Sequence, residues 1–152
     1  MAREEARARV IEDAETLTNL KIDASGRALV SQPPPEAPPG TTAISQTEFG
    51  SLSGTDDSFY TITNGTTLTI TRLLGGAEGN TNGGTSIELY EAPNGNTTGI
   101  GLIAVIFSNG QSTFLDLNRE FVGNGTRAIL LRRRRLDGGS SEVYGAWEGF
   151  ES

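Results

Sequence analysis

Residues 66–73 read Thr-Thr-Leu-Thr-Ile-Thr-Arg-Leu, and this stretch decides the fold class. Leu68 and Ile70 fall on one face of an extended chain and the threonines fall on the other, because successive side chains of a strand point to opposite faces. The pattern predicts a strand with one buried and one solvated face. The same alternation returns in residues 86–91.

Short β-rich segments of this kind continue from Thr41 to the end of the chain, separated by Gly and Asn. We predict eight strands, at residues 43–49, 58–63, 66–73, 86–91, 101–107, 112–117, 127–134 and 142–147. Asn-Gly dipeptides, which suit tight hairpin turns, lie directly between strands at 64–65 and 109–110. Eight such strands predict an all-β fold, an antiparallel β-sandwich that is jelly-roll-like.

Residues 102–107 are apolar on both faces of the predicted strand. This predicts either a central strand or a strand whose outer face is covered by a partner. The surrounding apolar run, residues 100–107, is too short to span a bilayer.

The first forty residues have a different composition, rich in charge and proline, and predict an N-terminal arm (1–40) ahead of the sandwich domain (41–152). Residues 3–20 predict a short helix with an apolar stripe that Asp13 interrupts. The stripe consists of Ala6, Val10, Leu17 and Leu20. A helix this short is marginal alone in water, so it needs a partner; the alternative is a frayed tail with helical bias.

The rest of the arm predicts extended structure. Residues 20–23 and 27–30 flank Ala24-Ser25-Gly26 and suggest a small hairpin. Residues 33–40 contain five prolines, which favour an extended polyproline II spacer. A ligand for an SH3 or WW domain is the alternative, but a spacer explains the position equally well.

Composition excludes several function classes. The net charge is −7, which gives no electrostatic advantage on nucleic acid or an anionic membrane. The chain has no Cys and no His, and its only lysine, Lys21, lies in the arm. It therefore lacks the commonest general base and the commonest metal ligand, and the position of Lys21 in the arm argues against a Ser-Lys pair. The N-terminus has no apolar segment typical of a secretory signal, so we expect a soluble product made in a cytoplasm.

No motif predicts catalysis, a cofactor or a metal. The glycine-rich residues 75–84 lack the Gly-Lys-Ser/Thr ending of a phosphate loop, and no stretch has EF-hand spacing. Most of the possible catalytic carboxylates fall on solvated strand positions or in turns, so solvation explains them better than a glycosidase pair. They are Asp56, Asp57, Glu88, Glu91, Asp116, Glu142 and Glu148.

Residues 132–135 are four consecutive arginines. Alternate arginines of a strand point to opposite faces, so the run cannot form one flat basic patch. They could stack on aromatic rings or pair with acids such as Glu142 and Glu148 on the following strand, and a cross-strand or intersubunit ion-pair network is favoured over nucleic-acid binding. The candidate partner-binding residues of the chain are Val10, Leu17, Leu20, Ile22, Arg132 and Arg134.

The layout resembles that of small virion structural proteins of tailed bacteriophages, particularly capsid decoration (cement) proteins. The resemblance rests on the charged arm (2–20), the spacer (33–40) and a Thr/Asn/Gly-rich sandwich that ends in Glu-Val-Tyr-Gly-Ala-Trp-Glu-Gly-Phe at 142–150. It implies a non-catalytic protein on the outer surface of a virion, which binds the major capsid protein, forms a homotrimer and uses its arm to tie neighbouring subunits together. It assigns no individual site residue.

A second interpretation is a carbohydrate- or receptor-binding module of a phage fibre or baseplate. Trp147, Tyr144, Tyr90 and Tyr60 would then be the stacking platforms. Aromatic residues make up 7% of the chain, and several occupy core-like positions, which leaves few rings for a sugar.

Overall fold

The structure is a computed structural model that describes residues 20–22, 28–30, 36–77, 84–108, 111–136 and 139–152. The chain divides into two compact units, Met1–Glu36 and Ala37–Ser152. In the first, β1 (Leu20–Ile22) pairs antiparallel with β2 (Ala28–Val30), at the two segments predicted to form a hairpin. Leu20, predicted to end the helix, instead begins β1; Val10, Leu17 and the rest of that helix lie outside the described residues.

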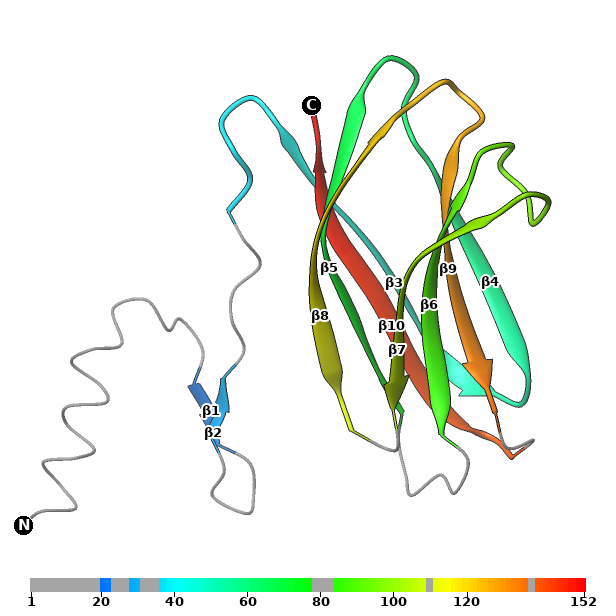
Figure 1. The fold of residues 1–152 in the computed structure, drawn as a ribbon. Coiled ribbons are helices and arrows are strands. Elements are labelled where there is room, and N and C mark those ends of the chain that lie inside the picture. Colours follow the sequence, from blue (N-terminus) through cyan, green and yellow to red (C-terminus); the bar gives the residue numbers. More distant parts are fainter. Residues whose placement is uncertain (1–19, 23–27, 31–35, 78–83, 109–110, 137–138) are drawn as a thin grey trace, which may run out of the picture. The chain divides into compact units, whose positions relative to one another are not determined.

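The second unit contains two four-stranded antiparallel sheets (Figure 1). One has the order β3-β10-β5-β8 and the other the order β4-β9-β6-β7. The strand bounds of the first are Thr42–Leu52, Ser141–Glu151, Thr67–Ala77 and Thr113–Val122. Those of the second are Thr55–Thr61, Ala128–Arg135, Thr85–Ala92 and Gly101–Ser108.

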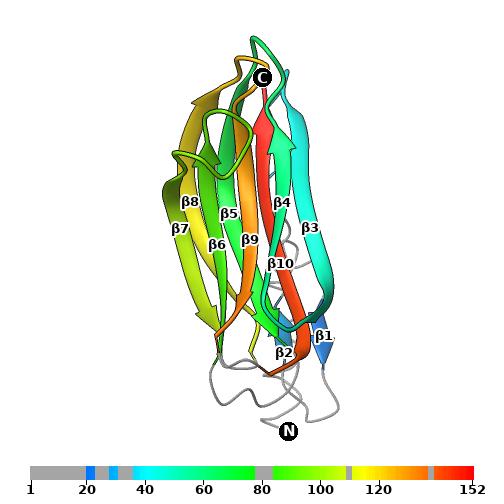
Figure 2. The ribbon, with the colours of Figure 1, turned by 90° about the vertical axis from the view of Figure 1, so that its right-hand side faces the viewer.

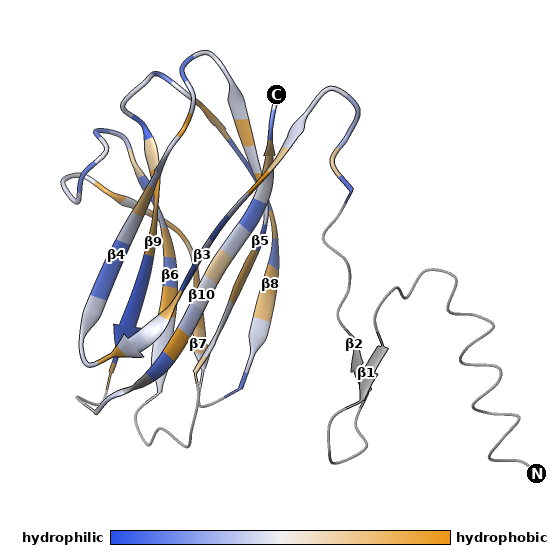
Figure 3. Cartoon of the chain, turned by 180° about the vertical axis from the view of Figure 1, so that it is seen from behind, coloured by the Kyte–Doolittle hydropathy of each residue, from blue (hydrophilic) through white to orange (hydrophobic). Residues whose placement is uncertain are grey.

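The all-β sandwich is confirmed for the described residues, which contain no helix. Each of the eight predicted segments falls on one of the strands β3 to β10, although most strands are longer than predicted. Figure 2 shows β3 and β4 along one side of the sandwich and β7 and β8 along the opposite side. Figure 3 shows how β9 changes along its length from hydrophobic residues to the hydrophilic arginines.

The two predicted Asn-Gly hairpins are wrong. Residues 64–65 connect β4 to β5 and residues 109–110 connect β7 to β8, and in both cases the two strands belong to different sheets. At the first of these turns only Gly65 has a positive φ, 82°, whereas the type I′ turn requires it at both central residues. Thr66 N donates to Thr63 O at 3.2 Å, so Gly65 occupies the third position of a turn that carries the chain across the sandwich.

The predicted extended spacer is also wrong at its C-terminal end. Thr41 N donates to Pro38 O at 3.1 Å, and Gly40 has a φ of 82°. Pro39 and Gly40 therefore occupy the two central positions of a type II turn, which favours proline followed by glycine. Residues 31–35 lie outside the described residues.

Strand β7 is an edge strand, so the prediction of a central strand for residues 102–107 is wrong. Ala104 and Ile106 point into the core and are buried, whereas Leu102 and Phe107 are exposed. Apolar residues on both faces of a strand do not show whether the strand is central or at an edge of the sheet. An exposed apolar face and a buried apolar face have the same sequence pattern.

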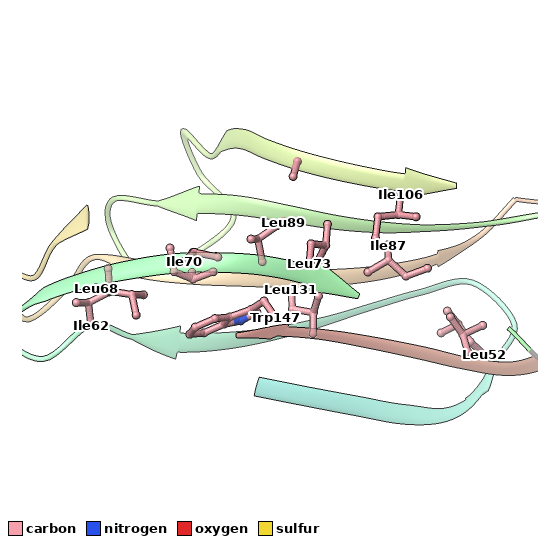
Figure 4. Packing of buried hydrophobic residues seen from close by; sticks show 13 residues of the cluster. Leu52, Ile62, Leu68, Ile70, Leu73, Ile87, Leu89, Ile106, Leu131 and Trp147 are labelled. Atoms are coloured by element: carbon pink, nitrogen blue, oxygen red, sulfur yellow. The ribbon is translucent and has the colours of Figure 1, made fainter. Parts of the chain in front are cut away.

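The core lies between the two sheets and is centred on Trp147, which is fully buried (Figure 4). Side chains of both sheets meet there, including Leu73 of β5 and Leu131 of β9. Burial of these apolar side chains is the main favourable contribution to folding. Tyr60 packs edge-on against the indole, with ring centroids 5.3 Å apart.

A polar link joins the sheets beside this cluster. Trp147 Nε1 donates to Gln46 Oε1 at 2.8 Å, and Gln46 Nε2 donates to Ser58 Oγ. Gln46 belongs to β3 and Ser58 to β4, so one amide satisfies the buried indole N–H and bridges the two layers.

Candidate interaction surface

The arginine run alternates between the two faces of its sheet, as predicted. On the outer face, Arg132 makes two parallel hydrogen bonds to Asp57, Nε to Oδ1 at 2.6 Å and Nη2 to Oδ2 at 2.8 Å. Its guanidinium also lies over the ring of Tyr90, 5.4 Å from the centroid. The hydrogen bonds to Asp57 raise the pKa of Arg132 above its ordinary value. This cation is therefore engaged within its own sheet.

A nearly buried carboxylate, Glu88, continues this network. Ser86 Oγ donates to Glu88 Oε1 at 2.7 Å, and the hydroxyl of Tyr90 donates to Oε2. Burial, followed by the hydrogen bond to Glu88, raises the pKa of Tyr90. Arg134 Nη2 lies 3.8 Å from the same carboxylate oxygen, and its side chain is 40% exposed.

The inner arginines stabilise one end of the sandwich. Arg133 is 6% exposed; its Nη1 donates to Val143 O at 2.7 Å and its Nη2 pairs with Asp56. Gly145 makes room for it, because a Cβ there would lie 3.2 Å from Arg133 Cγ. The predicted cross-strand ion pairs and aromatic stacking are thus confirmed. The prediction that Glu142 and Glu148 are the partners is wrong for Arg132, Arg133 and Arg134, which pair with acids of β4 and β6. The reason is that β9 and β10 lie in different sheets.

Most of the carboxylates that could have suggested catalysis are held in ion pairs. Asp56, Asp57, Glu88, Glu91 and Asp116 each face an arginine. In the described part of the chain, no group of three or more His, Cys, Asp or Glu side chains could hold a metal ion. A membrane-spanning helix is absent from the described segments.

The β7–β8 side of the sandwich carries large exposed apolar side chains. On β7, Leu102 is 58% and Phe107 69% exposed; on β8, Phe114 is 55% and Val122 58% exposed. Leu115 is 42% exposed although it lies opposite the buried Leu73 and so points inward. We call β7 and β8 together the open side, because even inward-pointing residues of β8 reach solvent there.

The outer face of the first sheet carries a smaller aromatic site. Phe49 and Tyr144 lie directly opposite each other on β3 and β10, and Phe49 is 60% exposed. A shallow groove of about 180 Å³ runs beside them and is also lined by Ser112 and Glu142. Of the four rings proposed as sugar platforms, Trp147 is in the core.

Two more of the four rings, Tyr60 and Tyr90, contact other side chains of the domain. Tyr60 packs on Trp147, and Tyr90 contacts Glu88 and Arg132. Tyr144 is therefore the one ring of the four that lines a described groove.

Comparison with known proteins identifies no family. No protein-family model matches the chain, and no curated protein matches it. Among solved structures, a mitogen from Yersinia pseudotuberculosis aligns with 71% of this chain and 86% of its own, at 13% identity and a TM-score of 0.40. The Drosophila NLP core, described in connection with pentamer formation and histone binding, aligns over 70% and 97%, at 21% identity and a TM-score of 0.38. We draw no functional conclusion from either likeness.

Proposed function

We propose that the chain is a non-catalytic virion structural protein of the capsid decoration type, with a jelly-roll domain that assembles through its open side. The strand pairs β3–β10, β4–β9, β5–β8 and β6–β7 support the jelly roll. The first strand of the domain pairs with the last, the second with the second-last, and so on inward, as in one long hairpin folded into two sheets. Eight-stranded jelly rolls of two sheets are typical of viral capsid proteins and of lectins.

The exposed apolar residues of the open side carry the proposal. Five large side chains, 42–69% exposed and distributed over both faces of these two edge strands, present on the order of 400 Å² of apolar surface. A stable protein interface buries about 800 Å² on each partner, so these side chains supply roughly half of one. The remainder would come from polar groups of the same strands. A second copy of the chain, in a homotrimer, is the partner that we propose for this side, and the major capsid protein is the partner of the assembled oligomer.

A non-catalytic role is supported by the state of the charged side chains. The carboxylates that face arginines are held in place for structure, which leaves them poorly placed to move protons in a reaction. The arm would act as a tether. The proline-rich composition of residues 33–40 supports this role, and tethering raises the effective concentration of a second weak contact.

The test is the location of the protein on particles. Antiserum raised against residues 41–152 should label the outer surface of intact virions from the source of the chain. A deletion of residues 1–40 should bind undecorated capsids much more weakly than the full chain, because tethering raises the effective concentration of a second weak contact. Absence of label from purified virions would reject the proposal, whereas equal binding by both forms would reject only the role of the arm.

A receptor- or carbohydrate-binding module is the second candidate, and one observation favours it. Phe49 and Tyr144 lie opposite each other on neighbouring strands, and both line a groove that is also lined by Glu142. Aromatic faces and carboxylates are suited to the apolar faces and hydroxyls of sugars. Saturable binding to a glycan array that Tyr144→Ala abolishes would favour this candidate over capsid decoration.

A further inference from the structure

A pocket of about 240 Å³ lies on the open side, between the beginning of β7 and the end of β8. Leu102 and Ile103 line it from β7, and Arg119 and Phe121 line it from β8. A register shift helps to form it: Leu89 pairs with Ala104 but Tyr90 pairs with Leu102, so that Ile103 is an extra residue. Such bulges bend an edge strand and are frequent beside binding sites.

Arg119 occupies a position that normally holds an apolar residue. It lies opposite the fully buried Ile70, and Phe121 lies opposite the fully buried Leu68, so both side chains are on the inner face of β8. With Leu115 and Leu117 they form one row at a spacing of two residues. Arg119 is exposed and lines the pocket, so its side chain leaves the inner face of β8 at a place where the space between the sheets opens to solvent.

The acidic residue that lines the pocket, Glu91, already has a cationic partner. Glu91 Oε1 lies 3.1 Å from Arg127 Nε, as an ion pair rather than an aligned hydrogen bond. Arg127 Nη1 in turn donates to Val122 O at 2.8 Å, which links the second sheet to the end of β8. Glu91 and Arg127 cancel, and the pocket keeps the positive charge of Arg119.

Arg119 differs from the other arginines in the described segments. Arg72, Arg127, Arg132, Arg133 and Arg134 each have a carboxylate partner, and Arg135 has an interaction of its own. No ion pair or side-chain hydrogen bond engages Arg119 among the described residues. In a chain with 19 acidic and 12 basic residues, an arginine that finds no internal acid is available to an external one.

We propose that this pocket binds a carboxylate attached to an apolar group. The Arg119 guanidinium hydrogen-bonds the carboxylate with two parallel N–H donors, a geometry that lysine does not provide. Leu102, Ile103 and Phe121 contact the apolar part. The carboxylate is supplied either by a free aliphatic acid or by an acidic side chain of a neighbouring copy, and the chemistry of recognition is the same. The binding property does not depend on where the protein works.

The experiment is an NMR titration of the full chain, labelled with ¹⁵N, with sodium hexanoate. We expect saturable shifts of the Arg119 Nε–H signal and of the amides of Ile103 and Phe121, with a Kd on the order of 1 mM, as suits one charge-assisted contact in a small apolar pocket. Hexan-1-ol should bind at least tenfold more weakly. Arg119→Gln should lose at least tenfold in affinity for hexanoate, and Arg119→Lys should recover little of it.

Arg134→Gln is the matched control, because it removes a partly exposed arginine from the outer face of the other sheet. It should leave hexanoate binding unchanged. The spectrum of each variant reports whether the domain is folded, so a loss of binding by a folded Arg119→Gln protein is interpretable. No saturable shift in the wild-type protein, or equal affinity in Arg119→Gln, would overturn the proposal.

Sedimentation velocity with and without hexanoate distinguishes the two sources of the carboxylate. A fall in the sedimentation coefficient at saturating hexanoate would mean that the acid displaces a neighbouring copy. An unchanged coefficient, together with the NMR shifts, would assign the pocket to a free acid and would place Leu102 outside the contact between copies. Either result supports the pocket, and neither depends on binding to a virion.

Discussion

Gln46 provides the sharpest test of how the two sheets are held together. Its amide oxygen accepts a hydrogen bond from the N–H of the fully buried Trp147, and its amide nitrogen donates one to Ser58 on the other sheet. In Gln46→Ala the N–H of the fully buried indole loses its partner. A buried unsatisfied donor costs about 1–3 kcal/mol, and we expect a loss of about 2 kcal/mol in the free energy of unfolding.

This loss corresponds to a clear shift in thermal stability. A domain of roughly 115 residues unfolds with an entropy of about 0.24 kcal/mol/K, so 2 kcal/mol lowers the midpoint by about 8 °C. Fluorescence of Trp147, the only tryptophan of the chain, follows the transition from within the core. Thr47→Ala is the control, because Thr47 is the next residue of β3 and is exposed; its midpoint should stay within about 2 °C of the wild type.

A double-mutant cycle shows whether the indole N–H is the cause. In a Trp147→Phe background, where circular dichroism replaces tryptophan fluorescence, no N–H remains to be satisfied, so Gln46→Ala should cost at least 1 kcal/mol less than in the wild type. The reasoning would be refuted if Gln46→Ala unfolded at the same temperature as Thr47→Ala, or if its cost were the same in both backgrounds.

Two further predictions concern the interior. Burial, followed by the charge of Glu151, raises the pKa of Tyr60 to about 12, so folding favours the neutral phenol; this stabilisation is complete below pH 10 and is lost as the pH rises from 10 to 12. An ultraviolet titration should show a late tyrosine that Tyr60→Phe removes, and a normal titration near pH 10 would contradict this. Gly149→Ala should prevent stable folding, because the new Cβ would lie 2.2 Å from Thr69 O. Gly54→Ala is the control: a Cβ there has nothing within 4 Å, so its free energy of unfolding in urea should lie within about 1 kcal/mol of the wild-type value. Similar urea midpoints for the two variants would contradict the packing.

The strands could be predicted from sequence because their signal is local. Leu68 and Ile70 alternate with threonines, and this alternation arises from the geometry of the strand itself. The pairing of strands was not predictable in the same way. An Asn-Gly dipeptide such as Asn64-Gly65 occurs both in hairpins and in connections between sheets. Here β5 pairs with the distant strands β10 and β8 and not with β4, and the dipeptide does not encode that pairing.

The arginine run shows the same limit. The alternation of Arg132 and Arg133 between faces follows from local geometry, but their partners Asp57 and Asp56 lie on β4, 75 and 77 residues away in sequence. Arg119 was missed although a signal existed. It interrupts the apolar row of Leu115, Leu117 and Phe121, and a charged residue at an inward position of a strand is a sequence-level indication of a site or of a protected edge.

The central claim is that the chain assembles through the open side, and sedimentation equilibrium of three proteins at micromolar concentration tests it most directly. Phe107→Asp places a charge on β7, and Phe49→Asp places the same charge on β3, where the phenyl group is similarly exposed. We predict trimers for the wild type and for Phe49→Asp, and a folded monomer for Phe107→Asp. A wild-type monomer, or a Phe107→Asp protein that associates as the wild type does, would contradict the account.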